Sequence, residues 1–430
     1  MNQTPHLMID GCDSVELAEK YGTPLYVLSL SHILSKVDEL KQAFGDYPRF
    51  RIAYAGKAFL TLGMIDILKK LNLCLDVVSG GEFNTALQAG FPTENIEFNG
   101  NNKLDWELEL AIKNNVGRII VDGFQEVERI HRMAEKLQKK VSILFRLTPG
   151  VAGDSHDYIV TGKKDSKFGF PIGSRALEDS IDQALDSSFI DLLGFHMHVG
   201  SQLHDNEVYM KSLDILFDFF DSLHEQRGFI VKELNIGGGF GIRYNEEDEP
   251  KPYAFFIEPI IEKVKTYYSK RDWDLPELVT EPGRSIIGEA GTTLYRVGSL
   301  KDIEGLRYYV CVDGGMNDNI RPALYGAVYN ALIANKLDQP RDTEVTITGK
   351  ICESGDIIAK DILLVKPEVG DLLAVFSTGA YGYSMASNYN KLPVPAVVLT
   401  YQGQSELMVR RQNLEDLNQY DLRPRMVDAL

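Results

Sequence analysis

Four short polar segments hold the residues whose types and spacing could do chemistry. A partly desolvated lysine can free its amine to form a Schiff base, and consecutive glycines let a backbone approach a phosphate closely. An acid and an arginine in one short loop could face a ring nitrogen and a carboxylate or phosphate. Taken singly, each feature also fits a surface lysine, a glycine turn or a surface ion pair. The segments are AYAGKAF with Lys57, HMHVGSQ with His198 and Ser201, NIGGGFG with Gly237, Gly238 and Gly239, and TEPGRS with Glu281, Gly283 and Arg284.

Two of the histidines, His196 and His198, have a spacing that could indicate a metal site. No obvious carboxylate or third histidine accompanies them, so no metal is predicted. The imidazole of His198 could instead stack on an aromatic ligand, and the hydroxyl of Ser201 could reach a phosphate. The glycine run lacks the Lys-Ser/Thr of a P-loop, which disfavours ATP or GTP.

The elements that must position these residues are repeated β-α units, because short apolar runs alternate with amphipathic segments from about residue 50 to 285. Helix candidates between the runs include residues 62–71, 81–90, 126–140, 209–226 and 255–270. Eight units predict a (β/α)8 barrel with its active site at the carboxyl ends of the strands. A doubly wound sheet has the same local pattern, but no Gly-x-Gly-x-x-Gly follows the first strand. The predicted strands are 51–55, 73–78, 95–99, 117–121, 141–146, 190–196, 231–236 and 277–281.

After Gly288 strand-like runs dominate, which predicts an all-β second domain, a β-sandwich or β-barrel. The runs are residues 292–300, 307–313, 344–353, 371–376, 395–401 and 406–411. The run TPLYVLS near the N-terminus also reads as a strand that precedes the barrel. We therefore expect a barrel domain over residues 30–285 and a β domain over 286–430 together with 1–29. Three turn-rich segments of the β domain, DGGMNDNIRPALYG, CESGD and TGAYGYSMASNYN, are expected to face a site or an interface.

The composition agrees with two globular domains, since 430 residues exceed the usual size of one hydrophobic core. A formal net charge of −17 opposes non-specific binding to nucleic acid or anionic lipid. No stretch approaches the roughly 20 apolar residues of a membrane span, and the first residues lack a basic segment followed by an apolar one. A cytoplasmic location is expected. The four scattered cysteines predict neither disulfides nor a structural zinc site.

In their order along nearly the whole chain, these segments resemble the alanine-racemase-like (fold type III) decarboxylases that depend on pyridoxal 5′-phosphate (PLP). Within that group the resemblance is closest to the diaminopimelate decarboxylases. The segments DVVSGGE and HDYIVTGKKDSKFGF add to it. Two departures, Gly56 and Phe59 beside the lysine, leave the Schiff-base assignment intact.

The resemblance implies a cofactor site. Lys57 would hold PLP as a Schiff base, His198 would stack on the pyridine face, and Glu281 would bind the pyridine nitrogen. Backbone amides at Gly237, Gly238 and Gly239, with Ser201, would bind the cofactor phosphate. Gly283, Arg284 and Tyr381 complete the implied cofactor set.

The resemblance also implies a substrate with a second amino-acid head. Arginines would hold its distal carboxylate and Glu353 its distal ammonium. Cys352 would donate the proton that replaces CO2, and Cys352 and Glu353 would reach the site from the other subunit of a homodimer. The implied substrate-binding residues are Arg284, Arg321, Tyr325, Glu353 and Tyr381.

The expected reaction is decarboxylation of meso-2,6-diaminoheptanedioate to L-lysine, the last step of lysine biosynthesis. Alternatives are a decarboxylase of carboxynorspermidine or of a basic amino acid, a racemase, and a non-catalytic PLP-binding regulator. Ornithine or arginine would need acidic partners rather than paired arginines. Retention of Lys57, Cys352 and Glu353 argues against the regulator.

Overall fold

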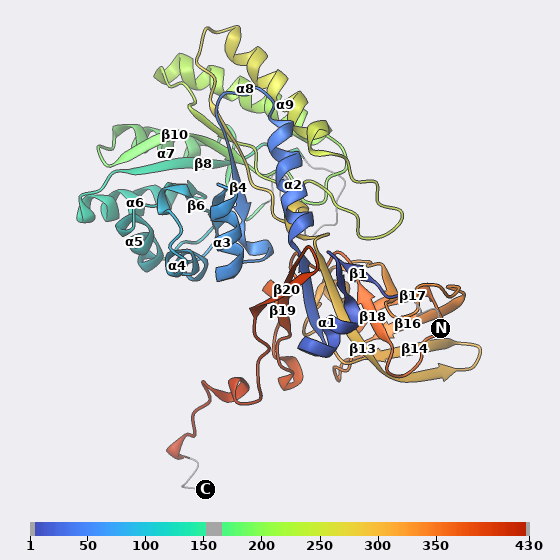
Figure 1. The fold of residues 1–430 in the computed structure, drawn as a ribbon. Helices are drawn as coiled ribbons and strands as arrows, with labels where there is room; N and C mark the ends of the chain where they lie inside the picture. The colour runs from blue at the N-terminus through green and yellow to red at the C-terminus, as the bar shows by residue number, and fades with distance from the viewer. Residues whose placement is uncertain (1–4, 152–165, 427–430) are drawn as a thin grey trace. The chain divides into compact units, whose positions relative to one another are not determined.

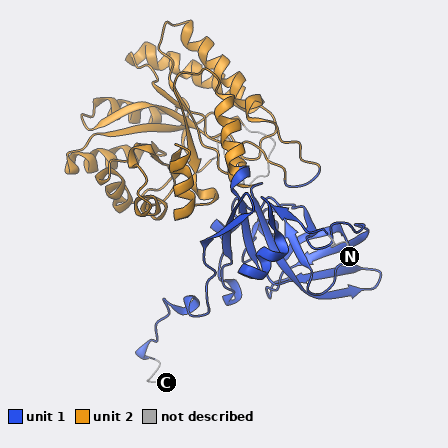
Figure 2. Ribbon diagram, viewed as in Figure 1, with its two compact units in different colours: residues 1–32, 244–246, 289–430 blue, residues 33–243, 247–288 orange. Residues whose placement is uncertain are grey.

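A computed structural model describes residues 5–151 and 166–426 of the chain. The chain divides into two compact units (Figure 2). Unit 1 comprises residues 1–32, 244–246 and 289–430, and unit 2 comprises residues 33–243 and 247–288.

Unit 2 is a closed barrel of eight parallel strands, which confirms the predicted fold class. Neighbouring strands pair in chain order, β12 pairs with β4 through Leu278 and Phe50, and β8 pairs with β10. A ninth short strand, β9 (Phe170–Pro171), extends the pairing at β8. The barrel strands are β4 (Phe50–Ala55), β5 (Cys74–Val77), β6 (Ile96–Phe98), β7 (Arg118–Val121), β8 (Val141–Thr148), β10 (Ile190–Met197), β11 (Glu233–Asn235) and β12 (Glu277–Thr280).

Helices cover the outside of the barrel, and successive helices pack on one another (Figure 1). Their first turns are stabilised by side-chain caps: Thr61, Ser79 and Ser174 each accept a backbone N–H at the start of a helix. The helices are α2 (Leu30–Ala43), α3 (Leu62–Lys70), α4 (Gly80–Gln88), α5 (Asp105–Lys113), α6 (Phe124–Leu137), α7 (Arg175–Asp186), α8 (Glu207–Arg227), α9 (Tyr253–Ser269) and the short α10 (Arg284–Ile287).

Unit 1 is built on one long strand, β13, which belongs to two sheets. Its first half pairs with β3 and β18, and its second half pairs with β14. The register shifts at Gly298, between Val297 and Ser299, where a bulge separates the two halves. The strands are β1 (Met8–Ile9), β2 (Cys12–Asp13), β3 (Leu25–Ser29), β13 (Gly291–Ile303), β14 (Arg307–Val312), β15 (Ala331–Ile333), β16 (Thr343–Thr348), β17 (Ile357–Leu364), β18 (Leu372–Val375), β19 (Ala396–Tyr401) and β20 (Gln404–Val409).

The N-terminal strand β3 lies between β13 and β19, antiparallel to the first and parallel to the second. Leu25 and Val27 on this strand are fully buried with Leu294 and Val398 in the core of unit 1. Two short helices, α1 (Ser14–Tyr21) and α11 (Arg321–Tyr325), complete the unit. In the described ranges of both units, every helix is too short or too polar to cross a bilayer.

Candidate active site

Lys57 lies in a single 3-10 turn, η1 (Gly56–Ala58), which directly follows the first barrel strand, β4. The strand itself is buried from Ile52 to Ala55, whereas the Lys57 side chain is exposed. Burial raises the pKa of the acids Asp76 and Glu281, and the positive charge of Lys57 acts against this effect in both. Lys57 therefore lies within electrostatic reach of carboxyl groups from strands on both sides of β4.

Glu281, directly after β12, is held by three polar side chains, which lie on β10, on β11 and directly after β6. Its Oε1 atom accepts the amide N–H groups of Asn99 at 3.0 Å and Asn235 at 2.9 Å. Its Oε2 atom lies 2.9 Å from Nε2 of His196, a residue that is only 1% exposed. A carboxylate with this many fixed donors is oriented before any ligand arrives.

Two neighbouring carboxyl groups have opposite pKa shifts. Burial alone would raise the pKa of Glu281, but His196 and Lys57 lower it below its ordinary value, so the group stays ionised at neutral pH. Burial, and next the charge of Glu281, raise the pKa of Asp76 well above its ordinary value. The two acids share Asn99, whose Nδ2 also donates to Asp76 at 2.6 Å. Such divergent pKa shifts are typical of functional sites.

The His198 side chain is half-buried beside the glycine run. Burial lowers the pKa of its imidazole well below the usual value, and the charges of Lys57 and Arg146 lower it further. The ring is therefore neutral at physiological pH. Its Nδ1 atom lies 3.4 Å from the backbone nitrogen of Gly238, which donates to it. A neutral, oriented imidazole suits stacking on an aromatic ring.

The glycine run is packed so closely that side chains are excluded. A Cβ atom on Gly237, which has φ +69°, would lie 2.5 Å from the carbonyl oxygen of Met197. A Cβ on Gly238 would lie 2.1 Å from the carbonyl oxygen of Glu281, and one on Gly239 would lie 2.2 Å from that of Gly200. The run, which follows β11, therefore packs directly against the backbone at the end of β10 and after β12.

Ser201 and Arg284 form the polar side of this group. A guanidinium nitrogen of Arg284 donates to the Ser201 hydroxyl at 3.1 Å. Gly283 lies against the lysine turn, because a Cβ there would lie 3.0 Å from Cβ of Ala55 and 3.1 Å from that of Ala58. A cation, a hydroxyl and backbone N–H groups are a donor set that suits a phosphate.

The predicted residues of unit 1 lie in the short helix α11 and in two loops. Arg321 is 8% exposed, and its Nε donates to the Tyr329 hydroxyl at 2.9 Å. Its guanidinium carbon lies 5.2 Å from the ring centre of Tyr325 and 5.4 Å from that of Tyr381. Three of the predicted substrate-binding residues thus lie together.

Cys352 and Glu353 lie in the turn between β16 and β17, and both side chains are exposed. The backbone N–H of Cys352 donates to Oδ1 of Asn390 at 2.7 Å. The Glu353 carboxylate accepts a hydrogen bond from the Tyr389 hydroxyl at 3.2 Å. How this turn meets a barrel site stays a prediction, as does its contribution to a dimer interface.

Sequence reasoning missed four residues of the barrel site: Asp76, Asn99, Asn235, and His196 in its contact with Glu281. Asp76, Asn235 and His196 lie near the ends of buried strands and Asn99 directly follows one, so their position was the available signal. The sequence pattern indicates His196 only as a candidate metal ligand. Residues 156–165 of the HDYIVTGKKDSKFGF segment lie outside the described residues.

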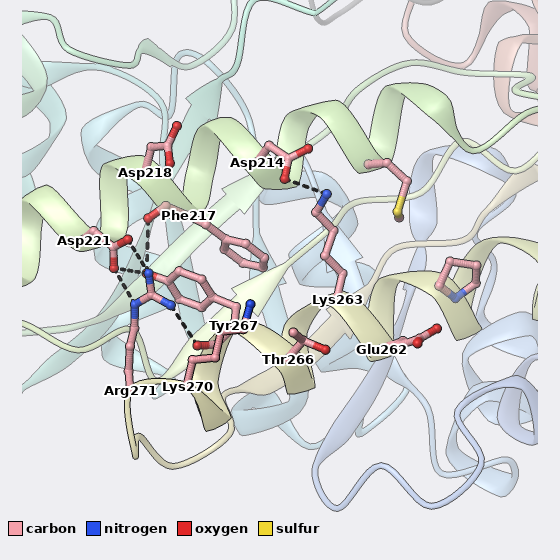
Figure 3. Close-up of a pocket in the computed structure, with 12 residues that line it drawn as sticks. Asp214, Phe217, Asp218, Asp221, Glu262, Lys263, Thr266, Tyr267, Lys270 and Arg271 are labelled. Carbon is pink, nitrogen blue, oxygen red and sulfur yellow. Dashed lines mark hydrogen bonds and ion pairs between the residues drawn. The ribbon is translucent and has the colours of Figure 1, made fainter.

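A separate groove runs along the outside of the barrel between α8 and α9 (Figure 3). Its charges are largely paired: Arg271 Nε donates to Asp221 at 2.6 Å, and Lys263 lies 2.6 Å from Asp214. Arg271 also stacks on the Tyr267 ring at 3.8 Å. None of the residues predicted for the active site lines this groove, which has the character of a surface ion-pair array.

Comparison with known proteins gives consistent matches over nearly the whole chain. The family described as "Pyridoxal-dependent decarboxylase, pyridoxal binding domain" matches residues 30–288. The diaminopimelate decarboxylase of Bacillus subtilis is 49% identical over 98% of this chain and 96% of its own length. That of Bacillus methanolicus is 47% identical over 96% of each chain. The crystal structure of the M. jannaschii diaminopimelate decarboxylase with L-lysine is 35% identical, covers 99% of both chains and has a TM-score of 0.92.

Proposed function

We propose a role for each active-site residue from the family of this chain, which belongs to the pyridoxal-dependent decarboxylases and, within them, to the diaminopimelate decarboxylases. The enzyme removes the carboxyl group at the D-centre of meso-2,6-diaminoheptanedioate as CO2. A proton takes its place on the same carbon, and the product is L-lysine. This is the last step of L-lysine biosynthesis.

The barrel residues fit PLP, the cofactor of this family. Lys57 would hold the cofactor aldehyde, Glu281 its ring nitrogen and His198 its ring face. Ser201, Arg284, Gly283 and the glycine run would hold its phosphate, with the N–H groups of Gly237 and Gly238 leaving the acceptors Asn235 and His198 that they have in this structure. When bound, PLP supplies an electron-accepting ring that takes up the electron pair left by CO2. The Cβ-excluding backbone of the glycine run and the donors beside it support this fit.

One observation carries this assignment: the Glu281 carboxylate is held ionised by His196, Asn99 and Asn235, within electrostatic reach of Lys57. An ionised acid at a ring nitrogen keeps that nitrogen protonated. The strength of the cofactor as an electron acceptor would therefore be set by Glu281.

We propose that Arg284, Arg321, Tyr325, Glu353 and Tyr381 recognise the substrate. The arginines would bind the distal carboxylate, and Glu353 the distal ammonium. The close approach of Arg321 to Tyr325 and Tyr381 supports a common binding surface. A site built for both charged groups should reject amino acids that lack either one.

Cys352 is proposed to deliver the proton to the carbon that loses CO2, in a homodimer whose subunits share their active sites. The exposure of Cys352 and Glu353 in the single chain supports a role at such an interface. A cytoplasmic location is proposed as well, since all four cysteines are free thiols, as in reducing compartments.

The reaction is tested by incubating purified protein and PLP separately with meso-diaminopimelate, L-ornithine, L-arginine and carboxynorspermidine, with products identified by mass spectrometry. L-lysine formed from diaminopimelate alone is expected. Turnover of another of these substrates would overturn the roles given to the arginines and Glu353. Absence of turnover with PLP bound to Lys57 would favour a regulatory protein.

A further inference from the structure

We propose that Tyr389 and Asn390 are positioning residues, which hold Glu353 and Cys352 in the orientation that the reaction requires. This inference rests on the proposed roles of Glu353 and Cys352 in the decarboxylation. It assigns Asn390 to proton delivery and Tyr389 to recognition of the distal ammonium.

Two adjacent residues on one loop contact two adjacent residues on another. Oδ1 of Asn390 accepts the backbone N–H of Cys352 at 2.7 Å. The Tyr389 hydroxyl donates to Oε2 of Glu353 at 3.2 Å, and this bond raises the pKa of the phenol. The phenol therefore keeps its proton at physiological pH and remains a donor. Each contact fixes one member of the Cys352–Glu353 pair.

The loop that makes these contacts is itself anchored. Asn390 has φ +53° and Lys391 has φ +55°, a left-handed pair that turns the chain. The Asn388 amide donates to the Leu392 carbonyl at 2.8 Å and to the Gln412 side chain at 2.6 Å. Asn388 thus ties the loop to the segment that follows β20.

The other end of the Cys352 turn is fixed by a buried carboxylate, Asp356, which is 4% exposed. Its two oxygens accept the backbone N–H groups of Met316 at 2.7 Å and Ile351 at 2.8 Å. A Cβ on Gly349 would lie 2.3 Å from Asp356 and 2.4 Å from Cα of Gly315. The turn is therefore held on both sides, although the two side chains at its tip are exposed.

Such restraint matters because an exposed thiol and an exposed carboxylate would otherwise sample many orientations. A proton donor has to lie within hydrogen-bond reach of the carbon it protonates, and a misplacement of about 1 Å can cost roughly 100-fold in rate. Loss of the Asn390 contact should therefore appear in kcat. Loss of the Tyr389 contact should appear in KM, because Glu353 acts in binding.

The test compares steady-state kinetics of the PLP-loaded full-length enzyme and three variants with meso-diaminopimelate. Asn390→Gly keeps the left-handed backbone but removes the acceptor, and kcat should fall about tenfold or more with KM little changed. Asn390→Asp keeps an acceptor oxygen and should restore most of kcat. Tyr389→Phe should raise KM about fivefold with kcat nearly unchanged. Tyr401→Phe, an exposed tyrosine on β19, is the matched control and should behave as wild type.

The proposal is overturned if Asn390→Gly and Tyr389→Phe keep wild-type constants. It is equally overturned if both variants change kcat and KM in parallel with a loss of thermal stability, because that pattern indicates a purely structural role. Failure of the wild type to release CO2 would instead reject the proposed function, so the two failures are distinguishable.

Discussion

At the scale of single residues, the least expected contact is that between His196 and Glu281. An i, i+2 histidine pair gives no sign of which ring will face an acid that lies two strands further along the chain, because that depends on how the barrel strands are placed side by side. Glu281, His198 and Lys57 could be singled out from their segments, since each follows an apolar strand. For the donors Asn99 and Asn235 the position at a strand end was visible, but their pairing with Glu281 was not, because it is known only when the strands are in register.

His196→Leu tests this contact through pH dependence. Without the imidazole, burial should raise the pKa of the Glu281 carboxyl, which His196 now lowers. The acid limb of the plot of kcat/KM against pH should then shift to higher pH by roughly one unit. His131→Leu, on the outer helix α6, is the control and should leave the limb in place. An unmoved limb in His196→Leu would show that the imidazole does not hold Glu281 ionised.

At the scale of elements, the eight barrel strands could be predicted to within about two residues at each end because each is a compact apolar run. Strand β17 was missed for a physical reason. Its residue Asp361 has φ +54°, and the exposed pair Lys360–Asp361 interrupts the alternation that marks a half-buried strand. The predicted run 344–353 was too long, since β16 ends at Thr348 and the Cys352 turn follows.

Two glycines with similar φ angles, Gly228 and Gly237, are predicted to respond differently to substitution by alanine. Gly228 has φ +66° and open space around it, so Gly228→Ala should cost about 1 kcal/mol. Gly237 has φ +69°, but its Cβ would meet Met197, so Gly237→Ala should cost more and weaken PLP binding at least tenfold. Urea unfolding and absorbance titration with PLP measure the two effects. Equal behaviour of the two variants would contradict the close packing.

In unit 1, Asp318 predicts a pH-dependent stability. Burial raises the pKa of this carboxyl to about 7, although the Tyr295 hydroxyl and the Gly315 N–H both donate to it. A carboxyl whose folded pKa is raised holds its proton more tightly when folded. The contribution of Asp318 to the free energy of unfolding is therefore fully present below the ordinary pKa of an aspartic acid. It is lost as the pH rises through about 7.

Asp318→Asn should remove this titration. The free energy of unfolding of both proteins is compared at about pH 5 and about pH 8. The decrease between these two pH values should be roughly 2 kcal/mol smaller in the variant than in the wild type. Urea unfolding at fixed protein concentration measures the slope, which is independent of any constant cost of the substitution. Asp302→Asn, at an exposed position of β13, is the control. Identical slopes for wild type and Asp318→Asn would refute the raised pKa.

At the scale of the whole molecule, the length of the chain and the strand-like runs that dominate after Gly288 predicted two domains. The N-terminal strand β3 does lie within the sheet of unit 1. The proposed shared site could not be derived in this way. Cys352 and Glu353 carry no local pattern that says which barrel they would serve, and only the family resemblance implied the barrel of a second subunit.

The proposed shared site predicts complementation between two inactive variants. Lys57→Ala lacks the cofactor anchor and Cys352→Ala lacks the proton donor. Equal mixing with subunit exchange should give half heterodimers, each with one intact site of two, and so about a quarter of wild-type activity. Activity that stays at the level of the separate variants would show that each chain builds its own site.

The most direct test of the central claim is the reaction of meso-diaminopimelate in D2O, followed by measurement of CO2 and of deuterium in the product. The account predicts one CO2 for each L-lysine, with a single non-exchangeable deuterium on the ε-carbon, where the carboxyl group had been. Deuterium at an α-carbon of unconsumed diaminopimelate without release of CO2 would contradict it and indicate a racemase.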